Sequence, residues 1–191
     1  MEPTNFKDHT IRVFVALPIP EHIAEELEIW THTNKERLPF RKWTHRKDYH
    51  ITLQFLGETS LVKLEALQAA LRNVRATPFS LSLNGVGFFG SPKAPRVLWT
   101  AVSGNLKGLN FLHSAVIQAT HTLGYVHEDR PYASHITLAR DFAVGKEISM
   151  GAITSAPVGA EWEADQFILM RTHMKTSPMY EVIDNYSYNL Q

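Results

Sequence analysis

The tetrapeptide His-Ile-Thr-Leu occurs twice in the chain, at residues 50–53 and again at residues 135–138. Side chains alternate between the two faces of a β-strand, so in each copy His and Thr share one face while Ile and Leu share the other. One such copy is common in ordinary strands. Two identical copies predict a pair of strands that each bury an apolar face and together present two imidazoles and two hydroxyls.

The spacing between the two copies recurs elsewhere in the chain. They are 85 positions apart (135 − 50). The same offset aligns three further pairs of segments with matching apolar patterns: 12–17 with 97–102, 21–33 with 106–118, and 79–83 with 164–168. The offset also aligns residues 60–74 with residues 145–159, but here the similarity is lost. Residues 60–74 have a helical pattern, whereas Gly, Ser and Pro interrupt residues 145–159. We interpret the offset as an internal duplication, and chance similarity on the common β-α-β rhythm is the alternative.

The length of 191 residues suits one well-buried domain or two small lobes in close contact. We expect a single domain over residues 1–191, built from two duplicated lobes at about 10–90 and 95–175. A C-terminal strand at 180–190 is expected to complete the sheet.

Apolar spacing and turn residues predict the order of the elements. Strands are expected at 10–17, 50–56, 79–83, 96–102, from 135, at 165–171 and at 180–188, with extended structure at 39–43. Helices are expected after Pro20, after a cap at Thr59 or Ser60, and from Leu106 to a C-terminal cap at Gly124. Gly57 is expected to end its strand, and Asn84-Gly85 to form a turn or bulge. This order predicts a mixed α+β fold with mostly antiparallel pairing.

Composition limits the possible functions. Lys+Arg and Asp+Glu both number 19, so there is no global basic field for long nucleic acid, and any such substrate must be bound locally. The absence of cysteine excludes disulfides, thiol nucleophiles and Cys-ligated metals. The start of the chain is polar, and no apolar run approaches the ~18 residues of a membrane span. We therefore expect a cytoplasmic protein that does not bind membranes.

Two such strands side by side, related by a pseudo-twofold axis, would bring both imidazoles and both hydroxyls to one spot that suits a tetrahedral phosphate. In-line attack at phosphorus needs a base on the entering oxygen and an acid on the leaving oxygen, on opposite sides. Histidine suits both roles because its unperturbed pKa of ~6.5 lets one ring be neutral and the other protonated. The motif is symmetric, so the two roles could be exchanged between His50 and His135.

Metal binding is the competing use of these two histidines. Two ligands without nearby carboxylates would bind a metal weakly, and the sequence has no HExxH, Walker, GxSxG or GxGxxG motif. The eight other histidines lie on expected helices, loops or the terminus without ligand spacing, and we expect them to be surface or locally satisfied residues. We therefore expect neither a metal nor a cofactor.

The paired motifs and their flanks resemble the 2H phosphoesterase superfamily. The matching segments are residues 12–18, Trp43 through Gly57, and Arg130 through Arg140, and the resemblance extends to the final strand. Within the superfamily the chain is most similar to the RNA 2′,3′-cyclic phosphodiesterases, historically called 2′-5′ RNA ligases. One departure is Ser134, where the family often has Pro before the second His, and it puts the local strand geometry in doubt.

The resemblance implies a bilobal α+β fold with a central cleft, sheets facing the cleft and helices packed outside. It implies hydrolysis of an RNA 2′,3′-cyclic phosphate to a 2′-phosphomonoester. His50 would be the proton donor and His135 the proton acceptor, and Thr52 and Thr137 would hold phosphate oxygens.

Phe55 and Arg140 lie at equivalent positions, five residues after His50 and His135 respectively. The resemblance suggests that Arg140 contacts phosphate and that Phe55 stacks on a base. Strict alternation would put both side chains on the core face, so each strand must bend or end first. The alternative is a core Phe and a solvated Arg at a strand end.

Other functions stay open at this stage. One is reversible 2′-5′ RNA ligation, and another is a non-catalytic module that binds RNA ends or nucleotides. The expected partners are RNA 3′ ends or short oligonucleotides that carry a cyclic phosphate. The sequence does not distinguish tRNA halves, short oligonucleotides and smaller cyclic nucleotides as the natural substrate. No obligatory protein partner is expected, and we expect a monomer.

Overall fold

The computed structural model describes residues 9–91 and 93–188. The elements follow one another as β1 (Thr10–Pro18), α1 (Glu21–Asn34), η1 (Lys35–Arg37), β2 (Phe40–Trp43), η2 (Arg46–Asp48), β3 (His50–Ser60), α2 (Leu61–Arg72), β4 (Phe79–Ser91), β5 (Ala94–Gly104), α3 (Leu106–His121), β6 (His135–Phe142), α4 (Met150–Thr154), β7 (Val158–Ala164), β8 (Gln166–Thr172) and β9 (Tyr180–Ser187). The mixed α+β class is confirmed. Part of the strand expected at 180–190 falls on residues 189–190, outside the described residues.

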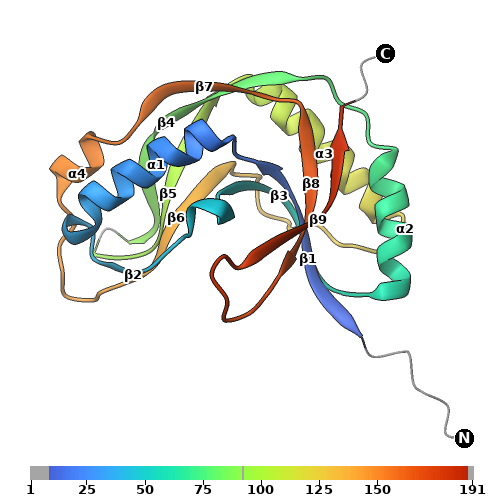
Figure 1. Cartoon of the computed structure of the whole chain (residues 1–191), viewed down its shortest axis with the longest axis horizontal. Helices are drawn as coiled ribbons and strands as arrows, with labels where there is room; N and C mark the ends of the chain where they lie inside the picture. The colour runs from blue at the N-terminus through green and yellow to red at the C-terminus, as the bar shows by residue number, and fades with distance from the viewer. Residues whose placement is uncertain (1–8, 92, 189–191) are drawn as a thin grey trace, which may run out of the picture.

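All nine strands belong to one sheet that curls into a half-barrel (Figure 1). The order is β7-β4-β5-β6-β3-β1-β8-β9, with β2 paired to β6, and every pairing is antiparallel. The two expected lobes therefore share a continuous sheet, and they meet where Ile51 of β3 pairs with Ile136 of β6. Outward from this junction, β1 and β5 occupy equivalent places, as the sequence offset predicts, although the duplication itself stays an interpretation.

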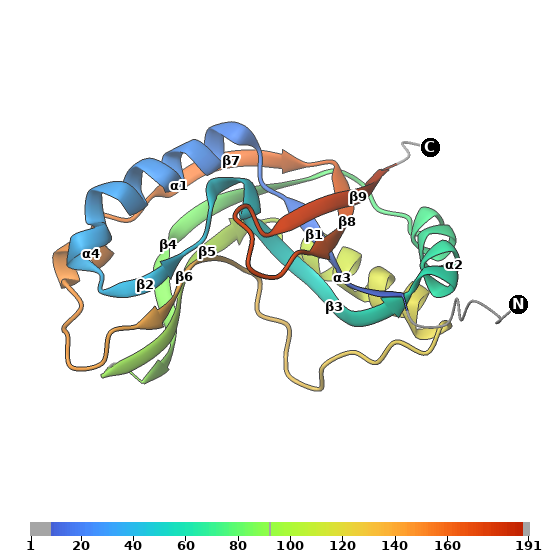
Figure 2. The ribbon, with the colours of Figure 1, turned by 60° about the horizontal axis from the view of Figure 1, so that its bottom comes forward.

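The helices divide between the two ends of the sheet. Helices α1 and α4 lie toward the end that holds β7, while α2 and α3 lie toward the other end (Figure 1). The segment that joins α3 to β6 runs as a long extended loop on the same side of the molecule as β3 (Figure 2). This loop brings the second His-Ile-Thr-Leu copy back to the first.

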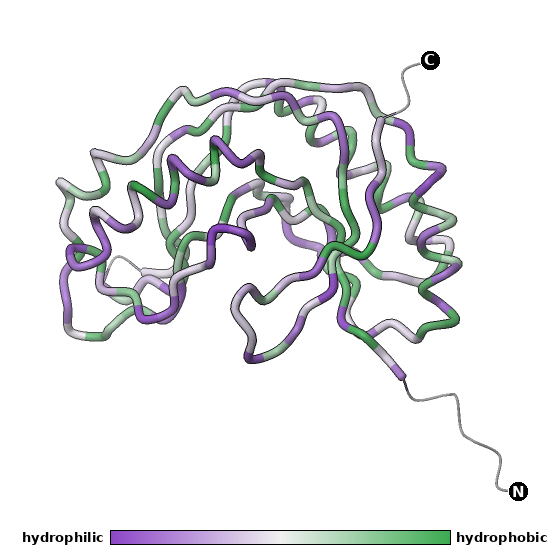
Figure 3. The backbone as a smooth tube through the Cα atoms, viewed as in Figure 1, coloured by the Kyte–Doolittle hydropathy of each residue, from purple (hydrophilic) through white to green (hydrophobic). Residues whose placement is uncertain are grey.

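The core forms from the faces that alternation predicts. Ile51, Leu53, Ile136 and Leu138 are all buried in one large apolar cluster that draws on both halves of the chain. Strand β1 is apolar on both faces, and its second face forms a smaller cluster with β8, visible as a green stretch where the two strands lie together (Figure 3). Burial on both faces explains the uninterrupted apolar run in β1.

Several boundaries differ from the prediction. Strand β3 does not end at Gly57 but continues to Ser60, because Gly57 adopts φ +72° and the adjacent register shift lets the pairing with β1 resume. Strand β4 continues past the bulge at Gly85 and reaches Ser91. Helix α4 lies in the region where the duplication was lost and strand β7 begins at its end, and neither element was predicted. Ser60 caps α2 as expected, with its hydroxyl accepting from the Lys63 amide at 3.3 Å.

Candidate active site

The two motifs meet at one cleft. Antiparallel pairing at Ile51 and Ile136 sets the two histidine-threonine faces beside each other, and β3 and β6 then diverge. The cleft between them has a volume of about 960 Å³, at the upper end of the ~300–1,000 Å³ range of ligand sites. The four motif residues all line it: His50, Thr52, His135 and Thr137.

Each histidine is oriented by a backbone carbonyl two residues before it. His50 Nδ1 lies 2.7 Å from the Asp48 carbonyl oxygen, and His135 Nδ1 lies 2.7 Å from the Ala133 carbonyl oxygen. A carbonyl only accepts hydrogen bonds, so Nδ1 carries the proton in both rings. Nε2 is therefore the nitrogen left for chemistry in both rings, and in His50 it lies 3.1 Å from the Thr52 hydroxyl.

Aromatic rings hold the two imidazoles in place. The His50 ring packs against Phe14 at 4.9 Å and edge-on against Tyr180 at 5.2 Å, measured between ring centroids. The His135 ring packs edge-on against Phe89 at 5.0 Å. These contacts shield part of each ring from water and limit its rotation.

Phe55 and Arg140 reach the cleft because both strands contain a bulge. In β3, Val15 pairs with Gln54 and Ala16 with Thr52, so Leu53 is an extra residue. The equivalent residue of β6, Leu138, is skipped in the pairing with β5. One extra residue reverses the alternation that follows it. Both side chains consequently line the cleft, Phe55 with 60% of its surface exposed, so the bend that the sequence required is present.

Asp48 and Tyr180 line the cleft without having been predicted as site residues, and Tyr132 lines it beside them. The carboxylate of Asp48 is buried and accepts hydrogen bonds from the amides of Met179 at 2.8 Å and Tyr180 at 3.1 Å. The Tyr132 hydroxyl donates a hydrogen bond to the Thr52 carbonyl at 3.0 Å, where β3 and β6 have separated. These contacts join residues 80 or more positions apart, so no local pattern could reveal them.

The cleft is basic although the chain is neutral. Its lining includes four of the ten histidines and three arginines, Arg96, Arg130 and Arg140, against two carboxylates. Both carboxylates have partners, since Asp48 accepts the two backbone amides and Glu128 pairs with Arg130 at 2.7 Å. The positive charge of the cleft therefore comes from its arginines, since burial keeps the two motif histidines mostly neutral in the free protein.

Burial sets the protonation of the histidine pair in the free protein. Burial lowers the pKa of His50 to about 4; the carbonyl and carboxylate of Asp48 oppose this shift, while His135 and Arg140 add to it. Burial also lowers the pKa of His135, with the Ala133 carbonyl opposing and Arg140 adding to the shift. Both rings are therefore mostly neutral at pH 7 in the free protein.

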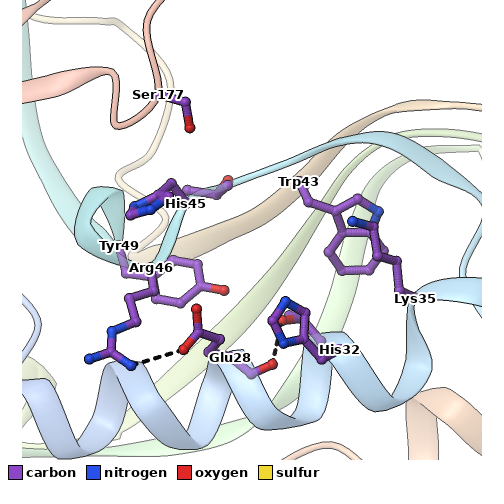
Figure 4. A pocket seen from close by; sticks show the side chains of 10 residues that line it. Glu28, His32, Lys35, Trp43, His45, Arg46, Tyr49 and Ser177 are labelled. Atoms are coloured by element: carbon purple, nitrogen blue, oxygen red, sulfur yellow. Dashed lines mark hydrogen bonds and ion pairs between the residues drawn. The ribbon is translucent and has the colours of Figure 1, made fainter.

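A second, smaller pocket lies beside the segment that leads to His50 (Figure 4). It has a volume of about 180 Å³ and lies between α1, residues 43–49 and Ser177. Arg46 crosses it to bind Glu28 of α1 at 2.9 Å and also pairs with Glu21, while the Tyr49 ring is buried beside them. These contacts anchor the segment that carries Asp48 against α1.

Residues 9–91 and 93–188 contain neither a metal-binding cluster nor a membrane-spanning helix. No group of three or more His, Cys, Asp or Glu side chains among them is arranged to hold a metal ion. None of the described helices combines the length and the apolar character needed to cross a membrane.

Comparisons with known proteins place the chain in a family. Residues 17–99 match the profile of the family described as LigT like Phosphoesterase. The chain is 34% identical to a protein named RNA 2′,3′-cyclic phosphodiesterase from Bacillus subtilis (strain 168), over 89% of this chain and 92% of that one. A relative of the same name from Geobacillus stearothermophilus is 36% identical over 89% of this chain, which spans only 55% of that longer protein.

Solved structures share the fold. E. coli LigT complexed with 3′-AMP superimposes with a TM-score of 0.79 at 24% identity, over 95% of this chain and all of that one. The protein TT0787 of Thermus thermophilus superimposes with a TM-score of 0.74 at 28% identity, over 93% of this chain and 98% of that one. Fold and paired motifs together define a phosphoesterase of the LigT type. The chain belongs to the LigT-like phosphoesterase family, among relatives named RNA 2′,3′-cyclic phosphodiesterase.

Proposed function

We propose that the protein hydrolyses RNA 2′,3′-cyclic phosphate ends to 2′-phosphomonoesters by acid–base catalysis that needs no metal. The observation that carries this proposal is the pair of cleft-lining histidines, each with its Nδ1 held by a backbone carbonyl so that Nε2 is the reactive nitrogen. The names of the relatives support the substrate class.

The proton transfers follow from this arrangement. Water attacks phosphorus and gives a proton to His135 Nε2, while the bond from phosphorus to the 3′ oxygen breaks. His50 Nε2–H gives its proton to that leaving oxygen, so the products are a 2′-phosphomonoester and a free 3′ hydroxyl. The Nε2 atoms of the pair therefore carry one proton before the step, on His50, and one proton after it, on His135.

The remaining cleft residues would bind and orient the substrate. The hydroxyls of Thr52 and Thr137 donate to the non-bridging phosphate oxygens, and the guanidinium of Arg140 neutralises developing charge. Arg140 Nη2 already lies 3.4 Å from the Thr137 hydroxyl, which places cation and donor together. The exposed face of Phe55 provides a surface on which a base can stack.

The nature of the substrate follows from the cleft and its charge. A neutral chain with a local cluster of arginines and histidines suits RNA 3′ ends or short oligonucleotides better than long duplexes. Nucleotide binding is also supported by the solved complex of E. coli LigT with 3′-AMP, a protein of the same fold. Action as a monomer in the cytoplasm stays a prediction from composition.

The test is a hydrolysis assay in EDTA with a short RNA that ends in a 2′,3′-cyclic phosphate. Wild type should form the 2′-phosphate, whereas His50→Ala and His135→Ala should each lose about 10²–10⁴-fold in kcat. His121→Ala, on the exposed end of α3, is the matched control and should retain wild-type activity. Turnover that survives both cleft substitutions would refute the histidine mechanism, and loss of wild-type turnover in EDTA would refute metal independence.

A further inference from the structure

The two motif copies differ in the residue that orients the histidine. The offset that aligns His50 with His135 also aligns Asp48 with Ala133. Each of these residues gives its carbonyl to the histidine Nδ1 at 2.7 Å, so the backbone geometry is the same in both copies. Only Asp48 adds a carboxylate, and the symmetry of the motif is broken at this position.

The Asp48 carboxylate connects the first motif to β9. It is only 5% exposed, and its two oxygens accept the successive amides of Met179 and Tyr180, at 2.8 and 3.1 Å. Tyr180 begins β9 and sets its ring edge-on against the His50 ring. One side chain thereby fixes both the carbonyl that orients His50 and the aromatic ring that packs on it.

The titratable groups that face His50 lie on three elements. Asp48 lies on η2, Tyr180 on β9, and His135 and Arg140 on β6, while the neighbouring Phe14 of β1 is uncharged. Of these described groups only Asp48 is negative. His135 faces Arg140 and the uncharged Ala133. A proton shared by the pair has a negative neighbour at His50 and lacks one at His135.

We propose that Asp48 is a positioning residue that prepares His50 to act as the proton donor, by fixing its ring and by offsetting, through its negative charge, part of the cost of protonating it. This role rests on the proposed hydrolysis of cyclic phosphates. It supplies a physical reason for an assignment that the symmetric motif alone leaves open.

The first test is an NMR titration of the histidine side chains in the free protein. Asp48→Asn keeps the size of the side chain and removes its charge, so the His50 titration should move to lower pH while that of His135 stays unchanged. Asp184→Asn removes a carboxylate from the same strand, β9, away from the cleft, and should move neither titration. Asp48→Ser also removes the charge and serves as the second variant where Asp48→Asn folds poorly.

The second test separates proton donation from other losses. One substrate is the RNA cyclic phosphate, whose 3′ oxygen leaves only with a proton. The other is 3′-deoxyuridine 2′-(4-nitrophenyl phosphate), from which water releases 4-nitrophenolate and the 2′-phosphate without a proton donor. On RNA, Asp48→Asn should lower kcat by about 10- to 100-fold, part of the ~10²–10⁴ that a positioned acid contributes. On the aryl ester, Asp48→Asn and His50→Ala should lose much less, and His135→Ala should lose as much as on RNA.

An unchanged His50 titration, or equal losses on both substrates, would overturn the role of Asp48. Wild type that leaves the RNA cyclic phosphate intact would instead refute the proposed function. In that case the titration, which needs no substrate, still decides whether Asp48 acts on His50.

Discussion

At the scale of single residues, the ionisation of the histidine pair makes activity depend on pH in a defined direction. The active pair carries one proton, and burial lowers the pKa of both rings in the free protein. We therefore expect kcat/KM, which reports the free enzyme, to fall with rising pH. The apparent pKa of this fall should lie below the unperturbed histidine value of ~6.5. A bound phosphate anion stabilises the imidazolium, so the alkaline limit of kcat should lie at higher pH. Rate profiles from about pH 4.5 to 9 measure both quantities. The prediction is wrong if the alkaline limit of kcat lies at the same pH as that of kcat/KM, or at a lower pH.

Arg140 acts on the same pair with the opposite sign to Asp48. Its positive charge contributes to the lowered pKa of both His50 and His135. Arg140→Gln should shift the alkaline limit of kcat/KM to higher pH. It should also raise KM about 10-fold or more, since a hydrogen bond to a charged group contributes ~1.5–3 kcal/mol. Arg130→Gln is the comparison, because Arg130 lines the same cleft but pairs with Glu128; a matching pH shift in that variant would rule out a local effect of Arg140.

At the scale of the strands, the divergence of β3 and β6 leaves the Thr52 carbonyl without a neighbouring strand, and the Tyr132 hydroxyl satisfies it. His113 of α3 stacks on the Tyr132 ring at 3.9 Å and holds it there. Tyr132→Phe should therefore lower the free energy of unfolding by about 1 kcal/mol, the net value of such a bond. Urea denaturation measures this difference.

The matched control for that substitution is Tyr188→Phe. The Tyr188 hydroxyl is buried and has no hydrogen-bond partner in the part of the chain that the structure describes. Its removal should leave stability unchanged or slightly raised. If both variants lose the same free energy, the hydrogen bond to Thr52 contributes nothing specific to the junction of the two strands.

The sequence of each strand predicts which of its faces is buried. It does not predict the irregularities that arise when the strand pairs with its neighbours. Alternation correctly buries Ile51 and Ile136, because that choice depends on the strand's own residues. The bulges at Leu53 and Leu138 arise from pairing with β1 and β5, and the sequence indicates only that a bend is needed. Asp48 has no recognisable signal at all, because the amides that it binds lie more than 130 positions away.

The missed strand β7 has a related cause. Its alternation is limited to Trp162 and Ala164 inward against exposed Glu161 and Glu163, and Gly159 interrupts it at the start. Such a short pattern is compatible with a loop until β4 is present to pair with it. Edge strands of this kind depend on their neighbours more than on their own propensity.

At the scale of the whole molecule, the two halves of the sequence are interlocked. Helix α1 belongs to the first half but packs near β7, and its Trp30 indole donates to the hydroxyl of Ser155, directly after α4, at 3.3 Å. Helix α3 belongs to the second half but packs against β3, where the Thr120 hydroxyl donates to the Gln54 side-chain carbonyl at 2.7 Å. The sheet is also continuous across the junction of β3 and β6. Neither half can therefore lose its structure without uncovering the core of the other.

We accordingly expect a single cooperative unfolding transition, although the chain exceeds the ~150 residues below which two-state behaviour is usual. The chain offers a direct test, because all four tryptophans lie on α1, β2, β5 and β7, and none on the side formed by β3, β1, β8 and β9. Tryptophan fluorescence thus reports one side of the junction, while far-UV circular dichroism reports both. In urea the two signals should give the same midpoint and the same slope. A fluorescence transition displaced from the dichroism transition would show instead that the two sides unfold separately and that the interlocked helices do not couple them.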